Sequence, residues 1–191
     1  PTMLLYKSAG AEVTDQTQGI WRVKFPPGML REILKASPEV FTQHARNPAN
    51  SVQIGGNNVV FAPSYGSPFV MDLDRGRRYG TIEDFRNFIK LSQSSPWLHH
   101  SGGTVCEPTD VPVNKRHLDM VYSHIRYSDR AFLGSITAPE RAADSVEMAR
   151  ILFGEAFTDR NCVVMGNFNT TSPMVIDGVT AAGIRTYAAA N

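Results

Sequence analysis

The sequence predicts an α/β protein. Residues 1–79 are expected to form an α+β region with β-hairpins, and residues 80–191 the first part of a (β/α)8 TIM barrel, truncated before closure. Two observations predict this class. The second half of the chain contains about three strand-then-helix units, each roughly the 30 residues of a βα repeat. A helix between successive strands returns the chain to the same end of the sheet, so these strands are expected to run parallel.

The first region is expected to contain two short helices. One covers residues 2–10 and ends at Gly10, because glycine is typical of helix C-termini. The second begins within residues 26–30 and stops at Pro38. Its apolar residues are expected to face inward: Leu30, Ile33 and Leu34.

Two hairpins are also expected in this region. The Gly-Gly-Asn-Asn segment after Ile54 separates two apolar runs, Val52–Ile54 and Val59–Phe61, which is a strong hairpin signal. The second hairpin joins Phe69–Leu73 to Arg77–Tyr79 through a turn that contains glycine. A loose domain boundary is placed near Tyr79.

A helix is expected to follow this boundary. The Thr81–Asp84 segment has the Thr-x-x-acid pattern of a helix start. Phe85, Phe88 and Ile89 then form an apolar stripe, and a Ser-Ser-Pro sequence ends the helix.

The first βα unit begins with a strand predicted over Trp97–Glu107. Alternation along a strand separates its residues into two sets, with His100, Gly102, Thr104 and Cys106 on one face and His99, Ser101, Gly103, Val105 and Glu107 on the other. After a proline-rich turn a helix is expected whose apolar face consists of Leu118, Val121, Tyr122 and Ile125.

The second and third units are shorter. A strand over 131–136 is followed by Thr137–Glu140, whose Thr-x-x-Glu pattern with an early proline predicts a capping box. A third strand over Asn161–Asn169 is followed by a polar loop and an Ala-rich segment from Asp177. The series then stops. A half-built parallel sheet leaves its edge and helix faces uncovered, so we expect either a piece of a larger protein or a chain that a partner completes. The chain alone is expected to be inactive and able to associate through that edge.

Composition excludes several classes of partner. The chain has 191 residues, 42% of them hydrophobic, which is enough for a core. Its 19 basic and 18 acidic residues are spread without runs, which argues against nucleic acid or an anionic membrane as a partner. The sequence shows neither a membrane span nor a signal pattern, so a cytoplasmic location is expected. The two cysteines are expected to be reduced thiols.

Candidate site residues follow from the expected strand ends, where the βα loops of a parallel barrel converge. Glu107 ends the first strand, and Asn167 and Asn169 share a face at the end of the third. Their amides suit a small polar ligand. Tyr65 and Phe168 offer aromatic faces for an organic cation, although core packing is favoured for Phe168.

Structural alternatives exist for these residues. Glu107 is either a carboxylate for a cationic ligand or a helix cap or ion-pair partner. Asn169 either binds a ligand or satisfies backbone groups in its own turn. His99, His100 and Cys106 are zinc-ligand types, but adjacent strand residues point opposite ways, so no metal is expected.

Two histidines of the helix after the first strand are given no function. His117 and His124 are seven residues apart and lie on the same side of the helix. We expect them at solvent or at an interface.

Several motifs in order resemble the trimethylamine methyltransferase (MttB-like) family. They are Phe41–Pro48 (FTQHARNP), Ile54–Phe61 (IGGNNVVF), Gly66–Asp72 (GSPFVMD), Glu107–Pro112 (EPTDVP) and Asn169–Pro173 (NTTSP). The similarity is collinear and covers nearly the whole chain.

The resemblance implies a (β/α)8 barrel that moves a methyl group from a methylated amine to the cob(I)alamin of a separate corrinoid protein. The chain would be the N-terminal and middle part of that barrel. Some members hold trimethylamine with a pyrrolysine, and none is seen in this sequence. Relatives without it act on quaternary amines such as glycine betaine, which is the preferred substrate class here. The cobalamin belongs to the partner, so no cofactor-binding or metal-binding residue is expected in this chain.

This resemblance implies roles for the candidate residues, while no catalytic residue is assigned. Glu107 and Tyr65 would face the ammonium group of the substrate. Donors for a betaine carboxylate would be Thr104, Ser135, Asn167 and Asn169. Two alternatives remain open: a non-catalytic binding or regulatory module of the same fold, and a cobalamin-independent barrel enzyme acting on a small polar metabolite.

Overall fold

The computed structural model describes residues 1–190, which divide into two compact units, Pro1–Glu39 and a second unit beginning at Val40. The division that the sequence suggests near Tyr79 falls inside the second unit.

The first unit contains α1 (Thr2–Ser8), β1 (Glu12–Asp15), β2 (Trp21–Lys24) and α2 (Met29–Leu34). β1 and β2 pair antiparallel, and the rings of Tyr6 and Phe25 meet edge to face at 5.8 Å. Both predicted helices are present. The prediction of an inward apolar face on α2 is wrong, because Leu30, Ile33 and Leu34 are exposed. This helix has only six residues, and no helix or strand of the first unit packs closely against it.

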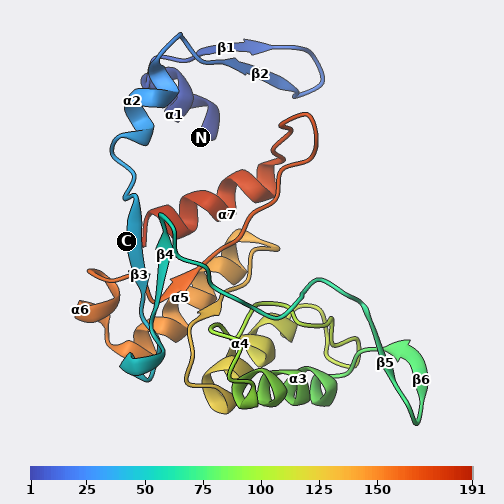
Figure 1. The fold of residues 1–191 in the computed structure, drawn as a ribbon. Helices are drawn as coiled ribbons and strands as arrows, with labels where there is room; N and C mark the ends of the chain where they lie inside the picture. The colour runs from blue at the N-terminus through green and yellow to red at the C-terminus, as the bar shows by residue number, and fades with distance from the viewer. Residues whose placement is uncertain (191) are drawn as a thin grey trace. The chain divides into compact units, whose positions relative to one another are not determined.

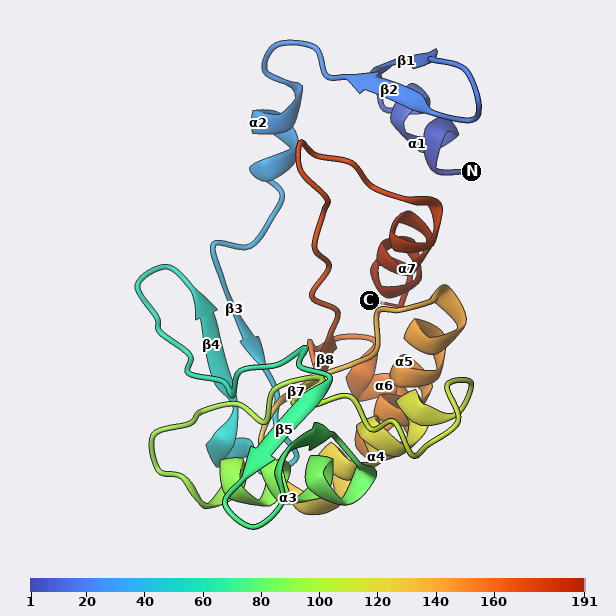
Figure 2. The same cartoon turned by 90° about the vertical axis from the view of Figure 1, so that its right-hand side faces the viewer.

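The second unit is built from short strands and longer helices (Figure 1). Its elements are β3 (Val40–Gln43), η1 (Pro48–Asn50), β4 (Val52–Gly55), β5 (Phe69–Asp72), β6 (Gly76–Tyr79), α3 (Ile82–Ser94), α4 (Arg116–Tyr127), β7 (Phe132–Leu133), α5 (Pro139–Phe153), α6 (Glu155–Thr158), β8 (Val164–Met165) and α7 (Gly178–Ala188). α3 packs beside α4 and α5 beside α7, as the two ribbon views agree (Figures 1 and 2). None of the described helices is long and apolar enough to cross a membrane.

The prediction of a partial barrel is confirmed only at the level of class. The fold is mixed α/β, and residues 1–190 contain four two-stranded sheets but no closed barrel. The predicted parallel pairing is present between β7 and β8, with Phe132 opposite Val164. Two further segments extend this pair: Ser101 and Gly102 share backbone hydrogen bonds with the β7 region, and Gln43 at the end of β3 forms a parallel bridge with Cys162.

Only one of the two predicted hairpins is correct. β5 and β6 form the expected antiparallel pair, with Phe69 opposite Tyr79. The hairpin predicted between Val52–Ile54 and Val59–Phe61 is wrong, because β4 pairs with β3 and residues 59–61 form no strand. Phe61 instead accepts a hydrogen bond from the backbone N–H of His99 at 2.8 Å, so it supports the next segment.

The start of α3 follows the sequence prediction closely. The Thr81 hydroxyl accepts the backbone N–H of Asp84, and the Asp84 carboxylate accepts the backbone N–H of Thr81, which completes a capping box. Arg78 on β6 donates to Asp84 at 2.7 Å and to Asp72 at 2.9 Å. These bonds hold the pKa of the Asp84 carboxyl well below its usual range. The second hairpin is thereby joined to the helix that follows it.

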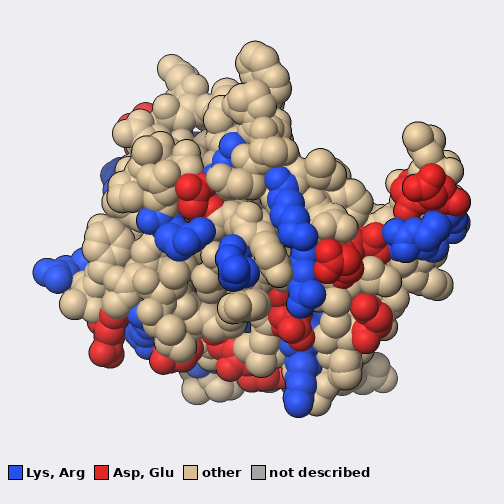
Figure 3. Space-filling model, turned by 90° about the horizontal axis from the view of Figure 1, so that it is seen from below, with Lys and Arg blue, Asp and Glu red and all other residues tan. Residues whose placement is uncertain are grey.

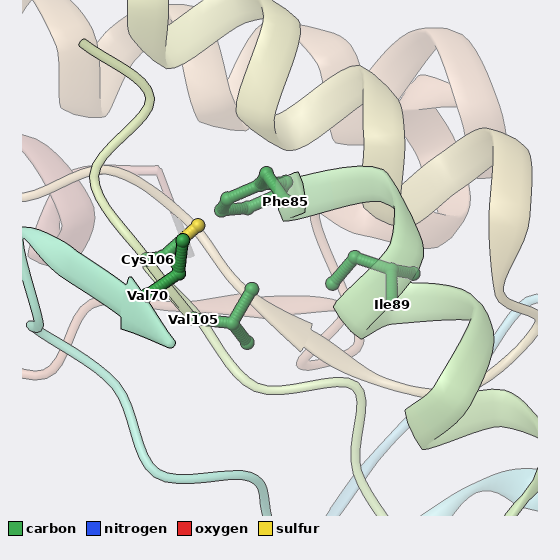
Figure 4. Packing of buried hydrophobic residues seen from close by; sticks show 5 residues of the cluster. All are labelled: Val70, Phe85, Ile89, Val105 and Cys106. Atoms are coloured by element: carbon green, nitrogen blue, oxygen red, sulfur yellow. The ribbon is translucent and has the colours of Figure 1, made fainter. Parts of the chain in front are cut away.

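A small apolar core lies between α3 and the segment that follows it. It consists of Val70, Phe85, Ile89, Val105 and Cys106, whose side chains converge in Figure 4. Burial raises the pKa of the Cys106 thiol to about 12, so this cysteine is packed as a small apolar side chain. Both cysteines are free thiols.

The strand predicted over Trp97–Glu107 is wrong, because no strand is present there. Gly102 has a φ of +88°, which turns the chain and ends the alternation. Consecutive residues are buried as a result, including His100 with Ser101 and Val105 with Cys106. The strands predicted over 131–136 and 161–169 are present but only two residues long.

The helix predicted after this segment is present as α4, but its buried face differs. Val121 is buried as expected, whereas Leu118 and Tyr122 are exposed. The prediction that His117 and His124 are exposed is wrong, because both are buried. Hydrogen bonds to both rings make burial possible. The predicted capping box at Thr137–Glu140 is also wrong: α5 begins at Pro139 after Ala138, with no side-chain cap.

Charged residues of both signs alternate over the face shown in Figure 3. This distribution agrees with the nearly balanced composition of the chain. It offers no broad surface of one sign on this face, as the sequence predicts.

Tyr187 on α7 packs over two glycines that follow the parallel strands. Its hydroxyl donates to the backbone carbonyl of Ser135 at 2.9 Å, and burial raises its pKa to about 12. A Cβ on Gly134 would lie 2.2 Å from the Tyr187 hydroxyl oxygen, and one on Gly166 would lie 2.7 Å from the Tyr187 and Phe168 rings. These two positions therefore have no room for a side chain.

We expect Gly166→Ala to lower the free energy of unfolding by about 1–3 kcal/mol, because the new methyl group forces two aromatic rings apart. Urea denaturation of the full-length protein measures this change. Gly178→Ala is the matched control, since a Cβ there meets no atom within 4 Å, and it should be neutral or slightly stabilising. Equal stability of the two variants would contradict the packing described.

Candidate functional site

A network of buried polar side chains joins Gln43 to β7 and to the segment around His100. The Gln43 amide is fully buried; its Nε2 donates to the Phe132 carbonyl at 2.8 Å, and its Oε1 is 3.1 Å from His100 Nε2. The backbone N–H of Gly102 donates to His100 Nδ1 at 2.8 Å. Nδ1 is therefore unprotonated and Nε2–H donates to Gln43, which assigns one neutral tautomer.

His124 is also neutral, and its ring is hydrogen-bonded at both nitrogens. Its Nε2–H donates to the Gly103 carbonyl at 2.9 Å, so its Nδ1 accepts the hydroxyl proton of Ser101 at 2.6 Å. The ring lies between Phe85 and Phe132. Burial lowers the pKa of both His100 and His124 to about 4. These rings are structural and hold the 100–103 segment beside β7.

Stability should fall as the pH falls from about 6.5 towards 4. The folded pKa of each ring lies below its ordinary value of 6.5, so over this window the unfolded chain binds protons that the folded chain does not. The stabilisation is complete above pH 6.5, and roughly 3 kcal/mol per histidine is lost by pH 4. Urea titrations of the full-length protein at several pH values measure the slope.

The variant His124→Gln should reduce this pH slope, although it lowers stability at pH 7.5 by removing a buried ring. Tyr122→Phe is the control, because Tyr122 is exposed on the same helix and should keep the wild-type slope. An unchanged slope in His124→Gln would rule out this histidine as a source of the pH dependence.

Three of the predicted substrate-binding residues line one open cleft. Thr104, Glu107 and Ser135 are brought together there from three parts of the sequence, in a cleft of about 70 Å³. Thr104 and Glu107 follow the 100–103 segment, and Ser135 follows β7. Since the segments that carry them run side by side, the residues after their ends meet at one edge, as predicted from the sequence.

Glu107 is an ion-pair partner in this structure. Its Oε1 accepts a hydrogen bond from Nη1 of Arg116, the first residue of α4. The other nitrogens of this guanidinium donate to the Val111 carbonyl at 3.0 and 3.2 Å. Glu107 was interpreted either as a carboxylate for a cationic ligand or as a helix cap or ion-pair partner. Its observed contact is the ion pair. The role in binding an ammonium group stays a prediction.

The predicted residues Asn167 and Tyr65 form a separate exposed pair. The Asn167 side-chain amide donates to the Tyr65 hydroxyl at 2.6 Å, although the residues are 102 positions apart. The adjacent Gly66 donates its N–H to the Thr104 carbonyl at 2.7 Å, which fixes the Tyr65 loop beside the cleft segment. Within residues 1–190 the Tyr65 hydroxyl donates no hydrogen bond and the Asn167 carbonyl oxygen accepts none. This pair offers one donor and one acceptor to a ligand.

Asn169 lies apart from these contacts. It is exposed, and no side-chain hydrogen bond of Asn169 is formed within residues 1–190. The turn that follows is closed by reciprocal backbone bonds between Thr171 and Val175. Phe168 meets the Tyr187 ring edge to face at 5.9 Å, which agrees with the favoured packing role. Among the described residues no three His, Cys, Asp or Glu side chains gather as metal ligands.

Sequence reasoning missed the polar residue Thr137 and three basic residues of the cleft, namely Arg116, His117 and Arg141. All three lie in the first turn of α4 or α5. Helices that return from a strand end begin near that end, so polar residues in these first turns were the available signal. His117 was predicted at solvent or at an interface instead, because the apolar face predicted for α4 did not include it.

Comparison with known proteins gives a consistent result. The model of the family described as trimethylamine methyltransferase (MTTB) matches residues 2–191. The chain is 41% identical, over all 191 residues, to a protein named glycine betaine methyltransferase from Desulfitobacterium hafniense strain Y51. It spans 39% of the length of that relative.

Proposed function

The chain belongs to the trimethylamine methyltransferase family, and on this basis we propose that the full-length protein moves a methyl group from a quaternary or tertiary methylamine to the cob(I)alamin of a separate corrinoid protein. Glycine betaine is the preferred substrate. The observation that carries this choice is the 41% identity to a glycine betaine methyltransferase along the whole chain.

The proposed reaction requires little acid–base catalysis from the protein. A quaternary ammonium already carries a neutral amine as its leaving group. The methyl carbon forms a bond to cobalt with the electron pair of Co(I), and the broken C–N bond leaves its electron pair on nitrogen. The protein has to position the amine and exclude competing reactions. The cobalamin acts as the methyl acceptor and comes with the partner, so this chain needs no cofactor site of its own.

We further propose that the parallel segments of the second unit belong to a (β/α)8 barrel in the full-length protein. β7, β8, the end of β3 and residues 101–102 run side by side, and helices follow β7 and β8. In such a barrel the loops after the strands surround the substrate. Thr104, Ser135 and Asn167 occupy these loops, which supports their predicted role. The corrinoid protein would present cobalt to the same mouth.

The assay uses the full-length protein, its corrinoid protein and cob(I)alamin under anaerobic conditions. We expect glycine betaine to convert the visible spectrum from cob(I)alamin to methylcobalamin, and trimethylamine to give no conversion. Conversion with trimethylamine alone would reverse the substrate choice. Failure with both amines would reject the proposal.

A second assay tests the exposed pair. Tyr65→Phe and Asn167→Ala remove the two partners of a contact beside the proposed substrate. We expect each to lower kcat/KM for betaine by about tenfold, the size of one lost hydrogen bond. Tyr79→Phe is the matched control, because Tyr79 is exposed on β6 within a hairpin that the cleft does not involve. Wild-type rates in both pair variants would remove Tyr65 and Asn167 from the site.

A further inference from the structure

His117 is buried with one ring nitrogen unpaired. The residue is 6% exposed, and its Nε2 is 2.7 Å from the Asp144 carboxylate on α5. Its Nδ1 is buried without a hydrogen-bond partner among the described residues. A buried polar atom without a partner costs free energy, so such an atom in a native fold needs an explanation. His117 is one of the residues that line the cleft with Thr104 and Ser135, so the side chain with this unpaired nitrogen lies beside the cleft.

The charges of this cleft are unbalanced. Glu107 and Arg116 neutralise each other in their ion pair. Arg141, in the first turn of α5, donates to the Thr137 hydroxyl at 2.8 Å and has no acidic partner within residues 1–190. A guanidinium with unused donors binds carboxylates in a planar, two-point geometry. The Asp and Glu, Lys and Arg side chains that line the cleft therefore carry one surplus positive charge, and Asp144 contacts His117 from outside this lining.

The remaining polar groups suit an anion as well. The hydroxyls of Thr104, Ser135 and Thr137 line the same cleft and each can donate a proton. Nε2–H of His117 donates to Asp144, and an imidazolium ring carries a second N–H at Nδ1, which has no other partner among the described residues. Asp144 fixes the ring orientation from the far side, as second partners of functional histidines do.

We propose that this cleft binds the carboxylate of the methylated amine, with Arg141 and His117 Nδ1 as its two anchoring donors. The inference rests on the proposed function for the identity of the ligand. It makes the substrate an amine with a carboxylate, of the betaine class, and gives a reason for preferring it over trimethylamine. Glu107 then holds Arg116 and the adjacent loop in place, rather than contacting the ammonium group.

Calorimetric titration of the full-length protein with three probes tests the site. Acetate carries only the carboxylate, tetramethylammonium only the cationic head, and glycine betaine both. We expect Arg141→Gln to weaken acetate and betaine about 10- to 100-fold, the effect of losing a charged hydrogen bond, and to leave tetramethylammonium unchanged. Arg141→Lys should retain part of the affinity, because it keeps the charge but loses the two-point geometry.

His117→Gln should weaken the same two probes, because its amide can replace the contact with Asp144 but leaves the Nδ1 position vacant. Arg150→Gln, also on α5 and paired with Asp159 away from the cleft, is the control and should bind all probes normally. Absence of acetate binding to the wild type, or wild-type affinity in Arg141→Gln, would overturn the site. Equal loss of all three probes would assign Arg141 a structural role and also overturn it.

Failure of this site and failure of the proposed function give different results. Acetate binding that depends on Arg141, without methyl transfer from any amine, rejects the function and keeps the anion site. Methyl transfer from betaine that is indifferent to Arg141 and His117 rejects the site and keeps the function.

Discussion

The second unit depends on one fully buried amide. Gln43 at the end of β3 donates to the carbonyl of Phe132 on β7 and accepts from His100, so it joins three segments that are far apart in the sequence. Burying an amide costs free energy unless its polar atoms form hydrogen bonds. The partners of Gln43 are the main-chain carbonyl of Phe132 and the Nε2–H of the neutral His100 ring. This requirement fixes how β3, β7 and the 100–103 segment lie against one another. The cleft residues Thr104 and Ser135 follow directly from two of these segments.

Local signals in the sequence predicted local structure well. The Thr81 capping box, the β5–β6 hairpin and the helical spacing of α3 are determined by residues within a few positions of each other, and the structure contains all three. The hairpin around Gly55 failed because its partner was a strand that precedes it, β3. The strand over Trp97–Glu107 failed because Gly102 adopts a positive φ that alternation cannot reveal. In both cases tertiary contacts overrode the pattern.

The candidate site was predictable to a similar extent. Placement at strand ends brought Thr104, Glu107 and Ser135 to one cleft and Asn167 to Tyr65. The basic residues of that cleft were missed, because a helix of polar and apolar residues allows more than one buried face and because no pattern indicated a hydrogen-bond partner for His117. Asp144, the residue that makes its burial possible, is 27 positions away on another helix. The burial of His117 therefore depends on its contact with Asp144, which the hydrophobic periodicity of α4 does not predict.

The bridge between Gln43 and Cys162 can form only late during synthesis of the chain. Cys162, which bridges Gln43, is 119 residues further along the chain, and translation adds about 5–20 residues per second. Roughly 6–24 seconds separate the appearance of the two residues at the ribosome. During this interval β3 can pair with β4, but the backbone edge at Gln43 that later bridges Cys162 has no partner strand. The nascent chain thus carries an unpaired strand edge for seconds, and such an edge can pair with another chain before Cys162 covers it.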